Sequence, residues 1–209
     1  MVKKILSIDF DIIMYPCIKM YNDKVGGEAN STQLWQGLEN DLDISNILSY
    51  DWITLKNIAQ LIAKSKNVHF IKEHQEVVDI LKSAAGWSED TYELTNVDFH
   101  HDLWYRQSDL AAITDFDQYN CSDWAGYLLL KNKLVDNHYT WLKAPNSDMP
   151  LQFNNIEYKL DLLKIRDFGS LLEQDFDEVF FCLSPQWVPY KYSKFYDIIQ
   201  LMYEYTHSM

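Results

Sequence analysis

Cysteine is scarce in this chain of 209 residues. The three cysteines, Cys17, Cys121 and Cys182, are odd in number and widely spaced. This pattern indicates neither a disulfide framework nor a structural zinc site, and it favours a reducing compartment. We therefore expect a cytoplasmic protein whose cysteines are small buried apolar groups.

Long apolar runs are also missing. No stretch approaches the roughly 18 consecutive apolar residues that a membrane-spanning helix needs. The apolar run near the N-terminus is interrupted at once by Asp9 and Asp11, which is not the pattern of a signal peptide. From the sequence we expect no membrane partner.

Basic residues are few, with 18 Lys and Arg against 31 Asp and Glu, so that the formal net charge is −13. An acidic surface repels the phosphate backbone, and we expect no nucleic-acid partner. The same charge would attract a cationic ligand, although acidic surfaces also serve solubility. The sequence leaves the oligomeric state open.

Apolar and aromatic residues, in contrast, are plentiful. Hydrophobic residues make up 47% of the chain, with 7 Trp, 14 Tyr and 10 Phe. That content excludes a disordered chain and is sufficient for one sizeable core. We expect a single domain over residues 1–209, with an irregular polar insertion at about 20–50.

Strand and helix patterns alternate along the chain. Strands are predicted at 4–10, 68–74 and 95–102, each ending in polar or charged residues, and at 178–185, which is a continuous apolar run stopped by Ser184-Pro185. Helical spacing predicts helices at 51–67, 76–86, 121–134 and 193–207, with a short helical or loop segment at 167–174 and ambiguous strands within 140–165. The alternation is typical of an α/β fold, here a three-layer sandwich around a mostly parallel central sheet.

Metal-binding side chains follow three of the predicted strands. They are Asp9 and Asp11 after the first, His74 after the second, and Asp98, His100 and Asp102 after the third. The carboxyl ends of parallel strands meet at one edge of a sheet, and alternate residues of an extended chain point the same way. We therefore expect all six side chains to converge. Four carboxylates in one place repel one another unless cations neutralise them.

Two divalent ions would neutralise such a cluster. A mixed set of carboxylates and imidazoles suits Mn²⁺, with Fe²⁺ or Zn²⁺ less favoured. Two neighbouring ions share a water and lower its pKa, which implies hydrolysis of a carbon–nitrogen, ester or phosphoryl centre. Any one of the three segments alone is better explained as an ordinary turn or helix start. Their joint occurrence at three strand ends favours the metal site.

The same segments resemble the arginase (ureohydrolase) superfamily. The lone histidine is His74 in KEHQE, the DxHxD motif lies in VDFHHD, and the SxDxD motif lies in SIDFD. The resemblance is closest to the small family that includes peptide arginases, and Ser184-Pro-Gln-Trp187 looks like its late strand-end loop. It implies an arginase-like fold and the conversion of arginine residues to ornithine and urea. The implied partner is an arginine-containing ribosomal precursor peptide.

The resemblance also implies separate roles for the six ligands of two Mn²⁺ ions. Asp9 and Asp98 would bridge both ions. His74 and Asp102 would complete one ion, and His100 and Asp11 the other. Asp102 would in addition accept a hydrogen bond from the bridging hydroxide as a catalytic group. In arginases the SxDxD segment follows the DxHxD segment, so its position at the N-terminus here implies a permuted motif order.

Further residues flank these motifs, each with a structural alternative. His101 is a candidate catalytic residue that supports the ligands or faces the substrate, or else it is only packed. Glu73 and Glu76 are candidates to grip a guanidinium group. Glu76 is also a candidate catalytic residue, while it suits a helix start equally well. Trp187 lines the mouth of the site or packs in the core. Two other functions stay open: hydrolysis of another amidine, amide or phosphoester, and a non-enzymatic, metal-stabilised binding protein.

Overall fold

A computed structural model describes residues 1–15, 35, 37, 40, 49–143 and 168–208. Most of the expected insertion at about 20–50 lies outside these residues, as do Cys17 and much of the ambiguous segment 140–165. No helix within the described ranges has both the length and the apolar character needed to cross a bilayer.

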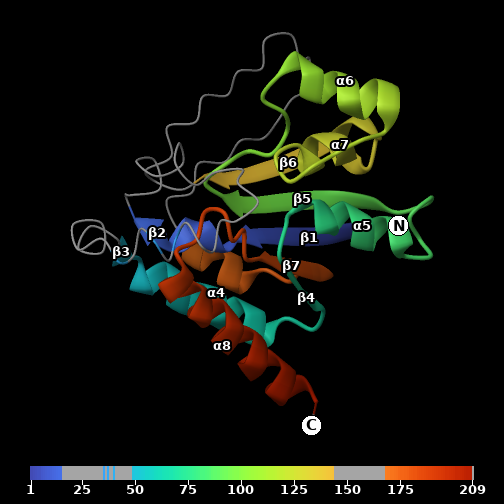
Figure 1. The fold of residues 1–209 in the computed structure, drawn as a ribbon. Coiled ribbons are helices and arrows are strands. Elements are labelled where there is room, and N and C mark those ends of the chain that lie inside the picture. Colours follow the sequence, from blue (N-terminus) through green and yellow to red (C-terminus); the bar gives the residue numbers. More distant parts are fainter. Residues whose placement is uncertain (16–34, 36, 38–39, 41–48, 144–167, 209) are drawn as a thin grey trace.

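Five strands form the central sheet, and every neighbouring pair in it runs parallel. In spatial order they are β4 (Val68–Ile71), β7 (Glu178–Cys182), β1 (Val2–Asp9), β5 (Thr91–Asp98) and β6 (Leu134–Lys143). A separate antiparallel pair consists of β2 (Met14–Tyr15) and β3 (Ser49–Tyr50). Because the sheet strands share one direction, their carboxyl ends lie along the same edge (Figure 1).

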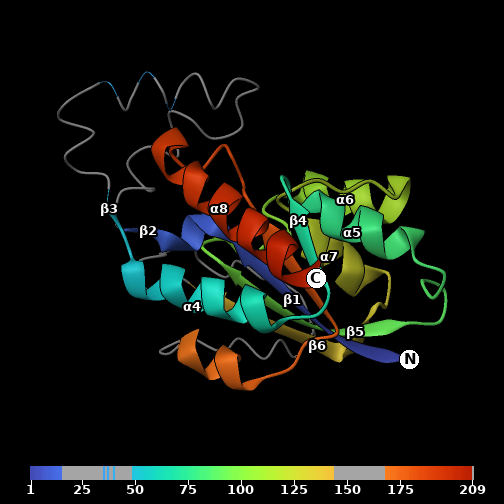
Figure 2. The same cartoon turned by 90° about the horizontal axis from the view of Figure 1, so that it is seen from below.

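Helices cover both faces of this sheet (Figures 1 and 2). The helical segments are η1 (Phe10–Ile13), α4 (Trp52–Lys64), α5 (Gln75–Ser83), α6 (Gln107–Phe116), α7 (Trp124–Leu130), η2 (Phe168–Glu173) and α8 (Tyr190–His207). One apolar cluster joins α4, η2 and α8 to the sheet, and a second joins α5, α6 and α7 to its other face. The expected α/β class, with a parallel central sheet between helical layers, is confirmed.

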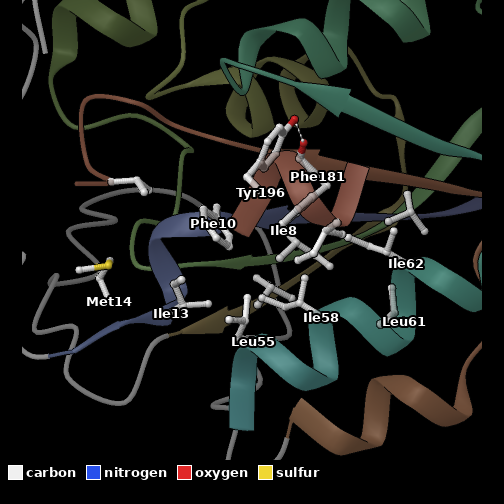
Figure 3. Packing of buried hydrophobic residues seen from close by; sticks show 14 of the residues in the cluster. Ile8, Phe10, Ile13, Met14, Leu55, Ile58, Leu61, Ile62, Phe181 and Tyr196 are labelled. Atoms are coloured by element: carbon white, nitrogen blue, oxygen red, sulfur yellow. Dashed lines mark hydrogen bonds between the residues drawn. The ribbon is translucent and has the colours of Figure 1, made fainter. Parts of the chain in front are cut away.

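The α4 face of the core shows how apolar spacing builds one of these layers. The helix buries Leu55, Ile58, Leu61 and Ile62, which recur on one side at helical spacing. Figure 3 shows them beside Ile8 of β1 and Phe181 of β7. Tyr196 of α8 packs on the same cluster, and its hydroxyl donates to the carbonyls of Ile71 (2.8 Å) and Phe181 (3.0 Å). These bonds hold α8 to the carboxyl ends of β4 and β7.

All four predicted strands are too long at their carboxyl ends, and those predicted at 4–10 and 178–185 end at Asp9 and Cys182. The strand predicted at 68–74 ends at Ile71, and His74 instead occupies the N-cap position of α5. The strand predicted at 95–102 begins earlier, at Thr91, and ends at Asp98. The chain turns there because the His100 N–H donates to Asp98 Oδ1 (2.8 Å), and Asp102 has a left-handed φ of 52°. Strand alternation therefore does not explain how the third group of ligands converges.

The region after this turn also differs from expectation. The helix predicted at 121–134 is only α7, and Leu134 already begins strand β6. Helix α6 was not predicted, since Ile113 is its only fully buried residue and the apolar pattern is weak. The polar stretch at 136–138 obscures the β6 pattern, although this strand pairs with β5.

Candidate metal centre

The six predicted metal ligands meet at the carboxyl edge of the sheet. They come from five places: the end of β1 (Asp9), η1 (Asp11), the start of α5 (His74), the end of β5 (Asp98), and the following loop (His100 and Asp102). Segments nearly ninety positions apart in the sequence are adjacent here because β1 pairs with β5, which aligns Ile8 with Val97. Asp9 and Asp98 are the next residues on the two strands.

His74 lies at the centre of the first group of ligands. Its Nδ1 is 3.1 Å from Asp102 Oδ2, 3.4 Å from Asp98 Oδ2 and 3.7 Å from Asp9 Oδ2. Asp9, His74 and Asp98 each offer one donor atom within 4.8 Å of the others. This spacing can hold a metal ion.

A second group lies next to the first and shares Asp98 with it. Asp11, Asp98 and His100 also offer donor atoms within 4.8 Å of one another. The Nδ1 atom of His100 is 3.8 Å from Asp11 Oδ2 and 3.6 Å from Asp98 Oδ1. Asp98 therefore presents Oδ2 to the first group and Oδ1 to the second. Two adjacent groups of side chains could therefore each hold a metal ion, and they share Asp98.

The carboxylates of this cluster are almost completely removed from solvent, with Asp11 and Asp98 at 0% exposure. Burial raises the pKa of Asp9 and raises those of Asp11 and Asp98 well above their ordinary value. Mutual repulsion adds to the effect at Asp11 and Asp98. A bound cation would offset both causes, because it supplies the opposite charge at the carboxylates.

Asp102 and His74 form the most favourable charge pair in the cluster. Burial acts to raise the pKa of Asp102, but the hydrogen bond from His74 and its charge lower that pKa below the ordinary value. Burial also acts to lower the pKa of His74, yet the charges of Cys182 and Asp9 and the hydrogen bond to Asp102 raise it well above normal. A metal ion at this position would take the place of the shared proton.

Buried polar atoms of the cluster are sparsely hydrogen-bonded among the described residues. The carboxylate oxygens of Asp11 and the Nε2 atom of His74 have no close hydrogen bond, and their weaker polar contacts are with the Phe99 N–H and the Cys182 thiol. An unsatisfied buried polar atom costs about 1–3 kcal/mol, so such atoms are rare unless they bind something else. Carboxylate oxygens and imidazole nitrogens with so few hydrogen bonds are suited to bind a divalent cation.

Other side chains hold the ligand oxygens in place. Ser184 Oγ donates to Asp9 Oδ2 (2.8 Å), and Trp124 Nε1 donates to Asp102 Oδ2 (2.7 Å). Asn96 Nδ2 lies 3.5 Å from Asp98 Oδ2. Sequence reasoning missed Asn96 and Trp124. Asn96 had a signal, since it precedes Asp98 by two positions on the same face of β5, whereas Trp124 reaches the site from a different element.

A cavity of about 440 Å³ opens beside the centre and is lined in part by Asp9, His74 and His100. The ring of Trp187 also lines it, with a centroid 5.3 Å from that of His100. The predicted position of Trp187 near the site mouth therefore agrees with its contacts. Cys121 lines the cavity and is only half-buried, and burial raises the pKa of its thiol to about 12.

The two glutamates beside His74 are engaged in other contacts. Glu76 Oε1 accepts from the backbone N–H groups of Lys72 and Glu73, both at 2.9 Å. These contacts favour the helix-start interpretation of Glu76 over a catalytic one. The Oε2 atom of Glu73 accepts from Gln186 Nε2 (2.8 Å), and Gln186 in turn lines the cavity. Glu73 therefore does not line the cavity itself but contacts Gln186, which does.

His101 has the contacts of a packed side chain. It is 2% exposed, its ring stacks on Tyr105 (4.4 Å between centroids), and it meets Trp141 edge-on (5.7 Å). Its Nδ1 atom accepts from the backbone N–H of Leu103 (3.2 Å). Burial lowers the pKa of His101 to about 4, so the ring is neutral at pH 7. These contacts favour packing over the catalytic role considered for it.

Neither protein-family models, nor curated proteins, nor solved structures include a match to this chain. The chemistry of the centre therefore follows from its own side chains. Three carboxylates (Asp9, Asp11 and Asp98) and two imidazoles (His74 and His100) form two groups that could each hold a metal ion beside the cavity. Asp102 belongs to neither group, although its Oδ2 lies 3.1 Å from His74.

Proposed function

We propose that this chain is a metal-dependent hydrolase that uses two divalent ions. The observation that carries this proposal is the pair of three-residue groups that share Asp98, with one oxygen of the shared carboxylate facing each group. The donors are carboxylate and imidazole and include no thiolate, a set that favours Mn²⁺ over Fe²⁺ or Zn²⁺. A structural zinc site would have a closed, mostly thiolate shell.

The chemistry of such a centre is hydrolytic. When bound, two adjacent divalent ions supply a water of lowered pKa as nucleophile and polarise the group that it attacks. The protein's own part is to orient the ligands through Ser184 and Trp124 and to keep the carboxylates out of bulk solvent. We assign to Asp102 the acceptance of a hydrogen bond from the nucleophile, because Trp124 fixes its carboxylate.

We propose that the group attacked is the guanidino carbon of an arginine residue in a ribosomal peptide. Water adds, the bond to the side-chain nitrogen breaks, and the products are ornithine and urea. Support comes from the three motifs that resemble the arginase superfamily and from Trp187, whose ring can stack on a guanidinium group at the cavity wall. The cavity is also large enough for a side chain, at about 440 Å³.

An arginase-like fold with permuted motif order is part of the same proposal. The SxDxD motif ends β1 and the DxHxD motif follows β5, and these two strands are direct neighbours in the sheet. Chain ends often lie close together, so a permutation can preserve a sheet and its site.

Mass spectrometry of arginine-containing peptides incubated with the Mn²⁺-loaded protein tests the activity. Each converted arginine should lose about 42 Da, the mass of the CN₂H₂ removed. The Asp98→Ala variant and metal-free protein should leave the peptides unchanged. The guanidino assignment fails if neither peptides nor free arginine change while two equivalents of Mn²⁺ are bound. A chain that folds identically without metal and binds none would instead support the non-enzymatic alternative.

A further inference from the structure

Arg106 is a positively charged residue on the wall of the cavity beside the metal centre. It immediately precedes α6 and lines the cavity together with His100 and Trp187. It is one of only two arginines in the chain. Within the part of the chain that the structure describes, its guanidinium group has neither an ion pair nor a hydrogen bond. This cation therefore has no partner among the residues that the structure describes.

The backbone of Arg106, in contrast, is firmly held. Asp109 Oδ2 accepts from the N–H groups of Arg106 (2.9 Å) and Tyr105 (3.2 Å). The carbonyl of Arg106 in turn accepts from the N–H groups of Asp109 (3.1 Å) and Leu110 (3.3 Å). The nearest acidic side chain in the sequence is thus engaged with the main chain. The backbone of Arg106 is therefore fixed beside the cavity, while its guanidinium group has no partner among the described residues.

The charge balance of the cavity favours an anionic ligand group. Asp9 is the only acidic residue among the described residues that line it, and Asp9 belongs to the metal centre. Two divalent ions would balance the four carboxylates of that centre, which leaves the charge of Arg106 in excess. Among the described residues that line this cavity, Arg106 would then be the side chain that contributes positive charge in addition to the ions, in a chain with a net charge of −13.

We propose that Arg106 binds an oxyanion group of the substrate, a carboxylate or a phosphate, while the metal centre acts on another part of the same molecule. The planar guanidinium group suits such oxyanions because it donates two parallel hydrogen bonds. This inference rests on the proposed hydrolase function. If the substrate is a guanidino compound, Arg106 would favour compounds or peptides that carry a carboxylate near the reacting guanidino group. Arg106 would then be a residue that determines specificity.

Isothermal titration calorimetry on the Mn²⁺-loaded protein tests the anion site directly. The probes are inorganic phosphate and acetate, which distinguish the two sources of the oxyanion. In Arg106→Gln we expect the affinity for at least one probe to fall about tenfold or more, the usual size of a charge-assisted hydrogen bond. The exposed Lys56→Gln on α4 is the matched charge-removing control and should bind like the parent. Equal affinities in Arg106→Gln and the parent would mean that the metal ions alone hold the anion, and would overturn the proposal.

A pair of guanidines separates this proposal from the hydrolase assignment. Guanidinobutyrate should bind the parent about tenfold more tightly than butylguanidine, and Arg106→Gln should lose that preference. A preference that persists in the variant, or its absence in the parent when both compounds bind, overturns the role of Arg106. If neither guanidine binds while phosphate or acetate still depends on Arg106, the oxyanion site stands and the guanidino substrate is wrong. Thermal melting of Arg106→Gln verifies folding, which this exposed side chain should not affect.

Discussion

Asp98 is the residue on which both cation positions depend. One of its oxygens faces the group with His74, and the other faces the group with His100. Its side chain is completely buried, so bulk water cannot stabilise the carboxylate charge in place of a cation. Neutralising this residue should therefore affect two ions, whereas removing His100 should affect one.

We predict that Asp98→Asn loses both bound Mn²⁺ ions together, while His100→Ala retains one. The asparagine keeps the shape of the side chain but removes the charge shared by both positions. Elemental analysis after gel filtration gives the number of ions per chain. Asp115→Asn, at an exposed position of α6, is the control and should bind as the parent does. If Asp98→Asn still bound one Mn²⁺ ion per chain, Asp98 would not be a ligand shared by both ions.

Trp124 acts on the centre through Asp102, to which it donates a hydrogen bond of 2.7 Å. We predict that Trp124→Phe lowers the affinity for Mn²⁺ about 10–100-fold, the usual effect of removing a partner that orients a ligand. The phenylalanine ring retains most of the packing, so circular dichroism should be unchanged. Competition with a metal indicator measures the affinity. An unchanged affinity in a folded variant would show that Asp102 needs no such support.

Metal binding should depend on pH because the ligands bind protons in its place. The pKa values of Asp11, Asp98 and His74 are all raised in the metal-free chain. At a given pH these groups hold more protons than they would when exposed, and each Mn²⁺ must displace them. The affinity should therefore fall as the pH is lowered through these raised values. Calorimetry in buffers of different ionisation enthalpy should show proton release, and its absence would contradict the prediction.

At the scale of elements, α7 holds the loop that carries the last two ligands. The N–H groups of Ala125 and Gly126 both donate to the carbonyl of Asp102, at 3.0 Å and 3.1 Å. The helix approaches so closely that a Cβ atom on Gly126 would lie 1.8 Å from the carbonyl oxygen of Leu103. A glycine is required at this position, since nothing else fits between helix and loop.

We predict that Gly126→Ala destabilises the protein by about 1–3 kcal/mol, the usual cost of overpacking, and weakens Mn²⁺ binding as well. The loop must move to admit the methyl group, and Asp102 moves with it. Denaturant unfolding and metal titration measure the two effects. Gly37→Ala is the matched control, because a Cβ atom there would meet nothing within 4 Å among the described residues. Normal stability of Gly126→Ala would show that the helix and loop separate without cost.

For the molecule as a whole, metal ions at this centre would join elements that otherwise meet at the sheet edge through mutually repelling carboxylates. We predict that Mn²⁺ at about 100 times its dissociation constant stabilises the fold by about 2.7 kcal/mol per site. That corresponds to a rise of roughly 5–10 °C per bound ion in the melting temperature of a domain of this size. Differential scanning fluorimetry measures the shift, and Asp98→Asn should abolish it. An equal rise in that variant would place the stabilising ion elsewhere.

Parts of this fold and site could be predicted from local sequence. The strand around Phe181 is a continuous apolar run because both faces of the sheet are covered. Helix α4 was expected because its apolar residues recur at helical spacing. The six ligands were recognisable because few other side chains bind divalent ions, and they follow directly on strands. Helix α6 and strand β6 lack such patterns and were missed.

The sequence by itself determined which side chains can bind metal and that strands and helices alternate, because donor chemistry and apolar periodicity are local properties. Only the tertiary structure decided how these residues meet. The order of the strands brings β5 beside β1, and a turn after Asp98 rather than an extended strand directs His100 inward. Trp124 and Arg106 reach the site from segments without a motif. Their positions follow from packing between distant elements, which no local pattern records.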